Sequence, residues 1–305
     1  MKMKLLHDQP DVQKLISIIE ADGPEEYEYE ELTSIWNGLK VEKESTTADV
    51  LTSKQLIHLF GDQFLSETIH GFSYRKPHGY AGDFQVIDYI YQQKINDNKR
   101  FQKWDKYFQA QHAAQAVRNR KNYFISVLRK KVSECKKAFR VLNIASGPCR
   151  DVLEFFEQLP PNKMNIHMHC VDIDTDAINY AKKLLERFID SVTFTRRNIF
   201  KFETAEKFDL IWSGGLFDYF NDDDFKKLLS KLYACCASPA EIIIGNFSIS
   251  NPTRAYMEKG LEWYLFHRTR EQLKGIALKA GIKDEQIRIR SEFLGVNLFL
   301  HIRVP

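Results

Sequence analysis

The spacing of hydrophobic residues changes along the chain near residue 138. From residue 1 to about 128, apolar residues recur with the spacing of amphipathic helices. The clearest segments are VQKLISIIE, LTSKQLIHLF, FQVIDYIYQQ and VRNRKNYFISVLRKKV. No strand is predicted in this part, and the charged runs at 23–32 and 40–50 are expected to form solvated helix or linker surface. The pattern therefore predicts a helical N-terminal domain over residues 1–128.

Beyond residue 138 the pattern alternates between short strands and helices. The predicted strands are FRVLNIA, NIHMHCVDI, SVTFTRRNI, KFDLIWSGG and AEIIIGNFS, and the helices between them are DVLEFFEQL, DAINYAKKLLERFI and DDDFKKLLSKLYACC. Such alternation indicates βαβ units and a parallel sheet with helices on both faces. The tail, QIRIRSEFLGVNLFLHIRV, predicts two antiparallel strands around a turn. Residues 129–305 are thus expected to form a doubly wound, Rossmann-like α/β domain with a C-terminal antiparallel hairpin.

Composition narrows the class of protein. The 305 residues are 44% hydrophobic and 13% aromatic, as expected of a packed globular chain. The 44 basic and 41 acidic residues nearly balance, which argues against a dedicated nucleic-acid binder. The five cysteines include no Cys-x-x-Cys pair, so neither a disulfide framework nor a metal site is indicated. The apolar run at the N-terminus is too short for a signal peptide, and no membrane span is evident. We expect a soluble, cytoplasmic protein.

The stretch RVLNIASGPCRDVLEFF (140–156) reads as strand, tight turn and helix. This arrangement directs backbone N–H groups and a helix N-terminus to one end of the sheet, where an anionic or nucleotide-like group can bind. The turn keeps one glycine and lacks the G-x-G-x-x-G dinucleotide fingerprint. Taken alone, it also fits an ordinary βα turn.

The ends of the next two strands carry candidate nucleotide-binding groups. Asp172 lies at the distance along the chain where a carboxylate binds ribose hydroxyls. Asp174 is expected to cap the following helix, although both acids also fit simple strand-end and cap positions. Asn198 and Ile199 end the third strand, where an amide and an apolar group lie beside a planar base.

The series VLNIASGPCRD, HCVDID, RRNIF and FDLIWSGGLFDYF resembles the class I S-adenosylmethionine-dependent methyltransferases, and the final hairpin is similar to that family's antiparallel strand. The resemblance covers residues 138–305 and departs from the broad family at Asn143, Ala145 and Cys149. It implies a seven-stranded sheet and S-adenosyl-L-methionine as the cofactor. The implied cofactor-binding residues are Asn143, Ala145, Ser146, Gly147, Asp172, Ile173, Asn198, Ile199, Ser213 and Gly214.

A narrower resemblance extends over nearly the whole chain. The stretches RKPHGYAGD (75–83), QAVRNR (115–120), NPTR (251–254) and EWY (262–264) are similar to a bacterial subgroup that includes 3-hydroxypalmitic acid methyl ester synthases. The first loop of that subgroup often has the Ala-Ser-Gly-Pro-Cys form. The resemblance implies that residues 1–128 act as a cap that binds substrate.

Methyl transfer is an in-line displacement, so the residues around it mainly align the reactants and exclude water. Arg118 or Arg120 is a candidate to pair with the cofactor carboxylate, because a guanidinium fits it bidentately. A solvated basic helix face explains the same arginines equally well. The loop with His78, Tyr80 and Asp83 is interpreted as a lid, and a structured turn capped by Asp83 is the alternative.

Other candidates lie near the ends of the later strands. Tyr219 follows the fourth strand and is expected to border the acceptor. Arg254 is the candidate to bind an anionic acceptor. His267 and His78 are candidate proton acceptors, although a single histidine is more often a structural hydrogen-bonding group.

These features predict a methyltransferase for a small molecule, acting on a carboxylate or hydroxyl such as that of a hydroxy fatty acid. N-methylation of an amine or amino-acid-derived natural product is the alternative. A non-catalytic protein that binds the cofactor and a nicotinamide dehydrogenase are weaker alternatives, the latter because the diphosphate-binding glycines are missing. No nucleic-acid partner and no membrane insertion are expected. The sequence is compatible with a monomer or a homodimer.

Overall fold

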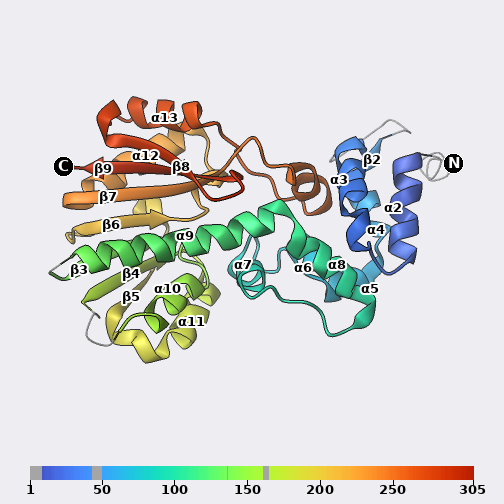
Figure 1. The fold of residues 1–305 in the computed structure, drawn as a ribbon, viewed down its shortest axis with the longest axis horizontal. Coiled ribbons are helices and arrows are strands. Elements are labelled where there is room, and N and C mark those ends of the chain that lie inside the picture. Colours follow the sequence, from blue (N-terminus) through green and yellow to red (C-terminus); the bar gives the residue numbers. More distant parts are fainter. Residues whose placement is uncertain (1–8, 43–49, 136, 161–164) are drawn as a thin grey trace. The chain divides into compact units, whose positions relative to one another are not determined.

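The computed structural model describes residues 9–42, 50–135, 137–160 and 165–305 (Figure 1). The chain forms two compact units, of which the first contains Met1–Gln115 and Pro252–Tyr264 and the second contains Ala116–Asn251 and Leu265–Pro305. The division falls inside helix α9 (His112–Glu134), whereas the hydrophobic pattern placed it between residues 128 and 129. The N-terminal residues 1–8 and most of the charged run at 40–50 lie outside the described residues.

The first unit is mainly helical, as the pattern predicts. Its helices are α2 (Pro10–Glu20), α3 (Tyr29–Gly38), α4 (Ser53–His58), α5 (Gly61–Glu67), α6 (Ile69–Arg75), α7 (Phe84–Tyr91) and α8 (Lys99–Ala110), with short turns η1 (Glu26–Glu28) and η6 (Tyr256–Gly260). The expectation of no strand is wrong at β1 (Val41–Glu42) and β2 (Leu51–Thr52), which pair in parallel. Two-residue strands are too short to show an alternating pattern in a sequence.

The second unit contains the predicted seven-stranded sheet. Its strands are β3 (Phe139–Ile144), β4 (Ile166–Asp172), β5 (Val192–Arg196), β6 (Phe208–Ser213), β7 (Cys236–Phe247), β8 (Ile287–Ser291) and β9 (Asn297–Val304). Their order across the sheet is β5-β4-β3-β6-β7-β9-β8. The β7–β9 and β8–β9 pairs are antiparallel and the other pairs are parallel. The Rossmann-like fold with a C-terminal antiparallel hairpin is confirmed.

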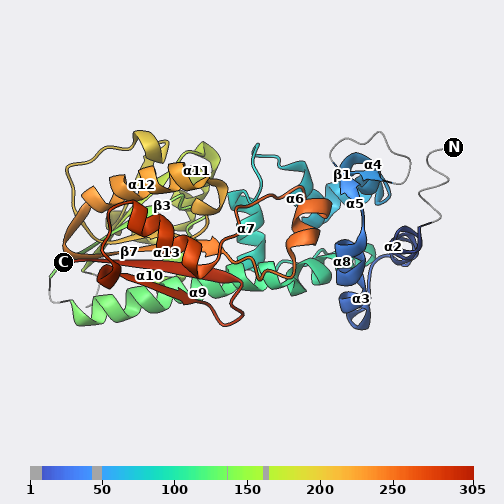
Figure 2. The same ribbon diagram turned by 90° about the horizontal axis from the view of Figure 1, so that it is seen from above.

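Helices cover this sheet on both sides, as the view in Figure 2 shows. They are α9, α10 (Arg150–Glu157), α11 (Thr175–Leu184), α12 (Asp222–Ala234) and α13 (Arg270–Lys279), with short 3₁₀ turns η3 (Glu186–Ser191), η4 (Ile199–Lys201), η5 (Phe217–Tyr219) and η7 (Asp284–Gln286). One apolar core joins the sheet to α12 and α13, and a second joins it to α9, α10 and α11. Helix α13 was not among the predicted helices, because its short apolar face is interrupted by Lys and Gly.

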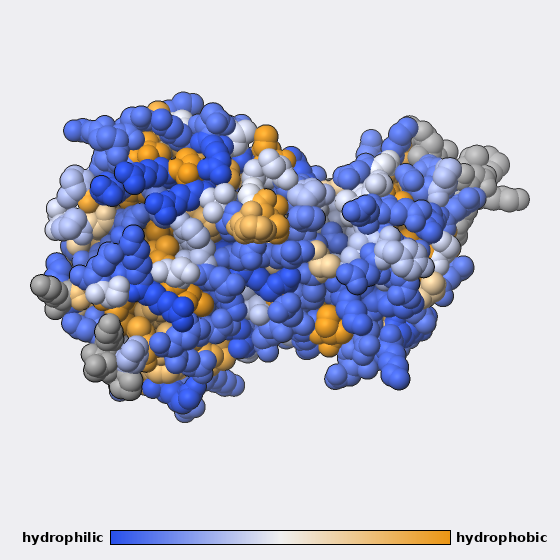
Figure 3. Space-filling model, viewed as in Figure 1, coloured by the Kyte–Doolittle hydropathy of each residue, from blue (hydrophilic) through white to orange (hydrophobic). Residues whose placement is uncertain are grey.

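The face drawn in Figure 3 is mostly hydrophilic, with small separate hydrophobic patches. Among the described residues, no helix is both long and apolar enough to cross a bilayer. All five cysteines are free thiols, and three of them are buried.

Candidate active site

The carboxyl ends of the parallel strands meet at one edge of the sheet, which we call the carboxyl edge. It is formed by the residues that end β3, β4, β6 and β7 and by the loops that follow them. Ligands of open α/β sheets bind at this edge. Most of the predicted site residues of the second unit lie here.

The loop between β3 and α10 has an unusual backbone. Ala145, Gly147 and Cys149 all have positive φ angles, at 49°, 54° and 54°. Two of the three are not glycine, and non-glycine residues rarely adopt this conformation, which costs on the order of 1–3 kcal/mol each. Successive N–H groups in such turns form concave surfaces that bind anions. The loop is therefore specialised although it lacks the glycine fingerprint.

Asp172 ends β4 and is tied to this loop. Its Oδ2 accepts a hydrogen bond from the N–H of Gly147 at 2.8 Å, and its Oδ1 accepts one from the N–H of Asp174 at 3.0 Å. Burial raises the pKa of Asp172, and the two N–H groups oppose that rise. Each carboxylate oxygen accepts more than one hydrogen bond, so both retain capacity for a ligand. The predicted helix cap is confirmed, because Asp174 Oδ1 accepts from the N–H of Asp176 at 2.8 Å.

The residues predicted to lie beside the nucleotide base, Ile173, Asn198 and Ile199, differ in solvent exposure. Ile173 directly follows Asp172 and is 59% exposed. The Asn198 side chain caps η4, and Ile199 is buried. The N–H of Arg197 donates to the backbone oxygen of Asp172 at 2.8 Å, which brings the end of β5 to the end of β4. The carboxyl edge thus places an exposed apolar side chain next to the buried Asp172 carboxylate.

Arg120 projects from α9 to the end of β6. A Cβ atom at Gly215 would lie 2.6 Å from Arg120 Nη1, and one at Gly214 would lie 3.4 Å from Arg120 Nε. The guanidinium therefore occupies space that is open because residues 214 and 215 have no side chain. Arg120 is 6% exposed and forms no hydrogen bond or ion pair with any described residue.

Three buried polar atoms of α9, β3 and β6 have no hydrogen-bond partner among the described residues. They are Arg120 Nε, Asn143 Nδ2 on β3 and Ser213 Oγ at the end of β6. β3 and β6 are neighbours, with Asn143 in register with Trp212. A buried polar group without a partner costs about 1–3 kcal/mol. The Trp212 ring stacks on Phe124 of α9, so Asn143 lies on the face of the sheet that α9 covers. Ser213 follows Trp212 and points to the other face. Arg120 Nε and Asn143 Nδ2 are both donors, which suits a ligand that carries acceptor oxygens.

Two buried acids flank the same region. Asp151 lies in the first turn of α10 and Asp218 in η5 after β6. Burial raises the pKa of each to about 6, and attraction to Arg120 works against that rise in both. Asp151 Oδ1 accepts the N–H of Val152 at 2.9 Å, and Asp218 Oδ1 accepts the N–H of Phe247 at 2.6 Å.

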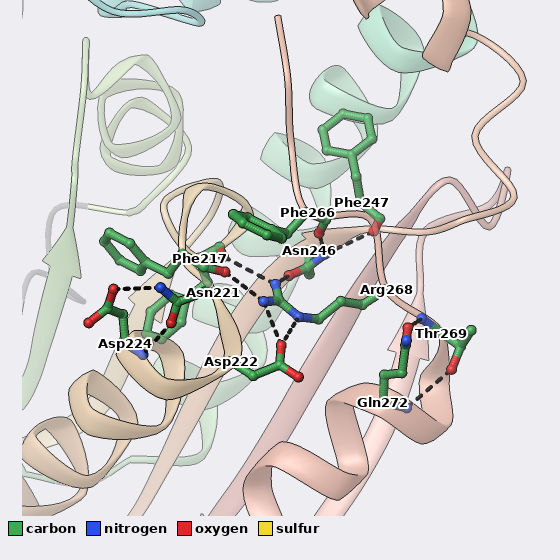
Figure 4. A network of polar contacts seen from close by, with 11 residues as sticks. Phe217, Asn221, Asp222, Asp224, Asn246, Phe247, Phe266, Arg268, Thr269 and Gln272 are labelled. Carbon is green, nitrogen blue, oxygen red and sulfur yellow. Dashed lines mark hydrogen bonds and ion pairs between the residues drawn. The ribbon is translucent and has the colours of Figure 1, made fainter.

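A buried arginine fixes the loop that contains Asp218 (Figure 4). Arg268 Nη1 donates to Asn246 Oδ1 at 2.9 Å, and its Nε and Nη2 donate to Asp222 Oδ1 at 3.1 Å and 2.9 Å. Nη2 also donates to the backbone oxygen of Phe220 at 2.6 Å. The end of β7 and the segment after β6 are thereby held together by one side chain. Tyr219 lies in this segment and is 37% exposed.

The predicted lid residues belong to the first unit. Asp83 is buried and caps α7, accepting the N–H groups of Gln85 and Val86 at 3.0 Å and 2.9 Å. His78 Nε2 lies 3.3 Å from the side-chain oxygen of Gln85. Tyr80, between glycines with positive φ at 79 and 82, is 37% exposed. The alternative interpretation of Asp83 as a helix cap is confirmed.

Three further candidates have protein partners. Arg254 also belongs to the first unit, and its Nε donates to Glu258 at 2.7 Å in an ion pair within one helical turn. His267 Nε2 lies 3.2 Å from Asn251 Nδ2 in the second unit. Arg118 is half-buried on α9 and is not without partners.

The sequence interpretation missed Gly215, Asp151 and Arg268. It weighed Arg118 and Arg120 for the cofactor carboxylate and counted Arg118 among the cofactor-binding residues. One signal was available for Arg120. It lies three residues after Val117 and four before Phe124, so it occupies the apolar face of α9. No local signal marks Arg268, whose partners lie 22 to 51 residues away along the chain.

Residues 135–286 match the family described as a methyltransferase domain. The chain carries a methyltransferase domain. Together with the seven-stranded sheet and its C-terminal antiparallel hairpin, this match makes the protein an S-adenosylmethionine-dependent methyltransferase, as the resemblance implied. No curated protein sequence matches the chain.

The fold of this methyltransferase is also found in solved structures. A protein from Bordetella parapertussis, described as a possible exported protein, has a TM-score of 0.62 and 15% identity over 73% of this chain and 79% of that one. A magnesium protoporphyrin IX methyltransferase from Synechocystis with bound S-adenosylmethionine has a TM-score of 0.47 and 12% identity, covering 72% and 96% of the two chains. An N-methyltransferase from Bradyrhizobium japonicum with S-adenosylhomocysteine has a TM-score of 0.46 and 14% identity, covering 73% and 98%.

Proposed function

We propose that this methyltransferase acts on an oxygen atom of a small molecule, namely a carboxylate or hydroxyl such as that of a hydroxy fatty acid. The observation that carries the proposal is the buried Arg120 guanidinium beside the end of β6, whose Nε has no partner among the described residues. A guanidinium binds and orients a carboxylate through two N–H groups. A carboxylate is already ionised near neutral pH, so its methylation requires alignment more than a strong base.

The chain's own residues fit the cofactor in this proposal. S-adenosylmethionine supplies a methyl group on a sulfonium when it is bound. Asp172 would accept hydrogen bonds from the ribose hydroxyls with the capacity that Gly147 and Asp174 leave free. Ile173, Asn198 and Ile199 would hold the adenine base. The backbone of Ala145, Ser146 and Gly147, with Ser213 and Gly214, would hold the methionine part.

A turnover screen tests the proposal directly. The purified protein is incubated with S-adenosylmethionine and separate panels of hydroxy fatty acids, simple carboxylic acids and amines, and S-adenosylhomocysteine release is measured. We expect release with an acid or hydroxyl acceptor, and slower release by the Asp172→Ala variant when the cofactor concentration is below saturation. Release with amines alone would overturn the assignment to oxygen and leave the methyltransferase activity intact.

N-methylation is the second candidate, and one observation favours it. Asp218 is a buried carboxyl at the carboxyl edge whose pKa is raised to about 6, which suits it to receive a proton from an amine. If an amine is the acceptor, kcat should fall as the pH drops below about 6, and Asp218→Asn should abolish that dependence.

The five free thiols fit a reducing compartment, and we place the reaction in the cytoplasm.

A further inference from the structure

We propose that Arg120 binds the carboxylate of a ligand, and that Gly215 leaves room for the Arg120 guanidinium because it has no side chain. This inference rests on the proposed function for the identity of the ligand. It assigns the anion-binding role to Arg120 rather than to Arg118.

The first argument is the cost of the unpaired charge. Arg120 is 6% exposed, yet it has no hydrogen bond or ion pair with a described residue. Guanidinium groups remain charged in proteins, and a buried charge is costly unless it is paired. The two nearby acids, Asp151 and Asp218, attract it without forming an ion pair and are themselves partly protonated near pH 6. An anionic ligand would supply the missing partner.

The second argument is steric. Gly215 lies in the loop after β6, and a Cβ atom there would approach Arg120 Nη1 to 2.6 Å, Cζ to 3.1 Å and Nη2 to 3.2 Å. Contacts this short with a side chain require that the guanidinium move. Because residue 215 has no side chain, the planar guanidinium of Arg120 can lie at the end of β6.

The third argument is a second donor on the same face of the sheet. Asn143 Nδ2 also lacks a partner among the described residues, and Asn143 is in register with Trp212, whose ring stacks on Phe124 of α9. A guanidinium binds a carboxylate through two parallel N–H···O bonds, and additional donors strengthen the same interaction. The carboxylate has two sources under the proposed function: the amino-acid end of the cofactor and an acid acceptor.

The role of Arg120 is tested by measuring two ligands, one with and one without a carboxylate, on the wild-type protein and on an Arg120 variant. Calorimetry measures the binding of S-adenosylhomocysteine and of its decarboxylated analogue to the wild-type protein and to Arg120→Gln. A cofactor carboxylate at Arg120 predicts at least about tenfold weaker binding of S-adenosylhomocysteine to the variant, with the analogue unaffected. Gly215→Ala should reproduce this loss, because its methyl group displaces the guanidinium. Arg129→Gln, an exposed change on the same helix, should leave both affinities unchanged.

A second experiment asks whether the carboxylate that binds Arg120 belongs to the methyl acceptor. The complex with S-adenosylhomocysteine is titrated with a hydroxy fatty acid and with its methyl ester. If the acceptor carboxylate binds Arg120, the variant should lose affinity for the acid alone while retaining that for S-adenosylhomocysteine. Equal affinities of wild type and Arg120→Gln in both experiments would overturn the proposal. Failure of the wild type to bind S-adenosylhomocysteine would instead count against the proposed function itself.

Thermal unfolding without ligand separates a binding role from a structural one. Removing an unpaired buried cation should leave the melting temperature of Arg120→Gln equal to or above that of the wild type. A structural arginine would behave in the opposite way, since its loss leaves former partners unsatisfied. A marked fall in melting temperature would therefore argue against the carboxylate-binding role.

Discussion

Asp172 makes structural contacts with the same carboxylate that we propose binds the cofactor ribose. Its oxygens accept hydrogen bonds from Gly147, in the loop between β3 and α10, and from Asp174, which precedes α11. This arrangement fixes the carboxylate before any ligand arrives, which reduces the entropy lost on binding. The neighbouring acid, Asp174, caps α11.

Replacing Asp172 and Asp174 one at a time should separate ligand binding from helix capping. We expect Asp172→Ala to weaken S-adenosylhomocysteine binding by at least about tenfold, because charge-assisted hydrogen bonds to the ribose are lost. Asp174→Ala should lower the free energy of unfolding by about 1 kcal/mol with little change in affinity. Calorimetry and urea denaturation measure the two quantities. Undiminished affinity in a folded Asp172→Ala protein would remove the ribose assignment.

The pH dependence of stability is a second property at this scale. The pKa of Asp218 is raised to about 6 by burial, so between its usual value near 3.8 and 6 the unfolded state loses a proton that the folded state keeps. Its contribution to stability is fully present below pH 3.8 and is lost as the pH rises through 6. Asp218→Asn should therefore flatten the stability curve in this window. Urea denaturation at several pH values measures it, and an unchanged slope would contradict the prediction.

At the scale of elements, neighbouring strands approach each other closely where they carry glycine. Gly245 lies near the end of β7, and a Cβ atom there would be 2.2 Å from the backbone oxygen of Gly214, just after β6. Glycine thus permits the two strand ends to meet at the carboxyl edge. Gly275, within α13, has no atom within 4 Å of such a position.

These two glycines provide a matched pair of substitutions. Gly245→Ala should lower the free energy of unfolding by about 1–3 kcal/mol or more, because a backbone atom must move to admit the methyl group. Gly275→Ala should raise it by about 0.5–1 kcal/mol, since alanine is favoured in a helix interior. Chemical denaturation compares them. Equal effects of both substitutions would refute the close-approach explanation.

At the scale of the whole molecule, the first unit is built from two separate parts of the chain. The segment Pro252–Tyr264 completes it, and Tyr256 packs against Trp36, His70 and Tyr107 with ring centroids 5.2–5.4 Å apart. The Tyr256 hydroxyl lies 3.0 Å from Nδ1 of His70. A segment that leaves the α/β unit therefore supplies part of the core of the helical unit.

Two substitutions at Tyr256 measure this contribution. Tyr256→Ala should cost about 3–5 kcal/mol of stability, as expected for removing a buried aromatic ring. Tyr256→Phe removes only the contact with His70 and should cost about 1 kcal/mol. Denaturation followed by circular dichroism and tryptophan fluorescence detects both. A Tyr256→Ala protein as stable as the wild type would show that the segment is dispensable for this unit.

The sequence by itself determined the seven strands of the large sheet, most of the helices and their order, because helical and alternating patterns reflect interactions between near neighbours. It missed β1, β2 and α13, which are too short or too irregular to show such a pattern. It likewise determined the capping role of Asp174 and the strand-end position of Asp172, which are local properties. It did not determine the burial of Arg120 beside Gly215, the partners of Arg268, or the attachment of Pro252–Tyr264 to the first unit. These depend on contacts between residues far apart along the chain, and only tertiary packing decides which polar groups lose water and which of them find partners.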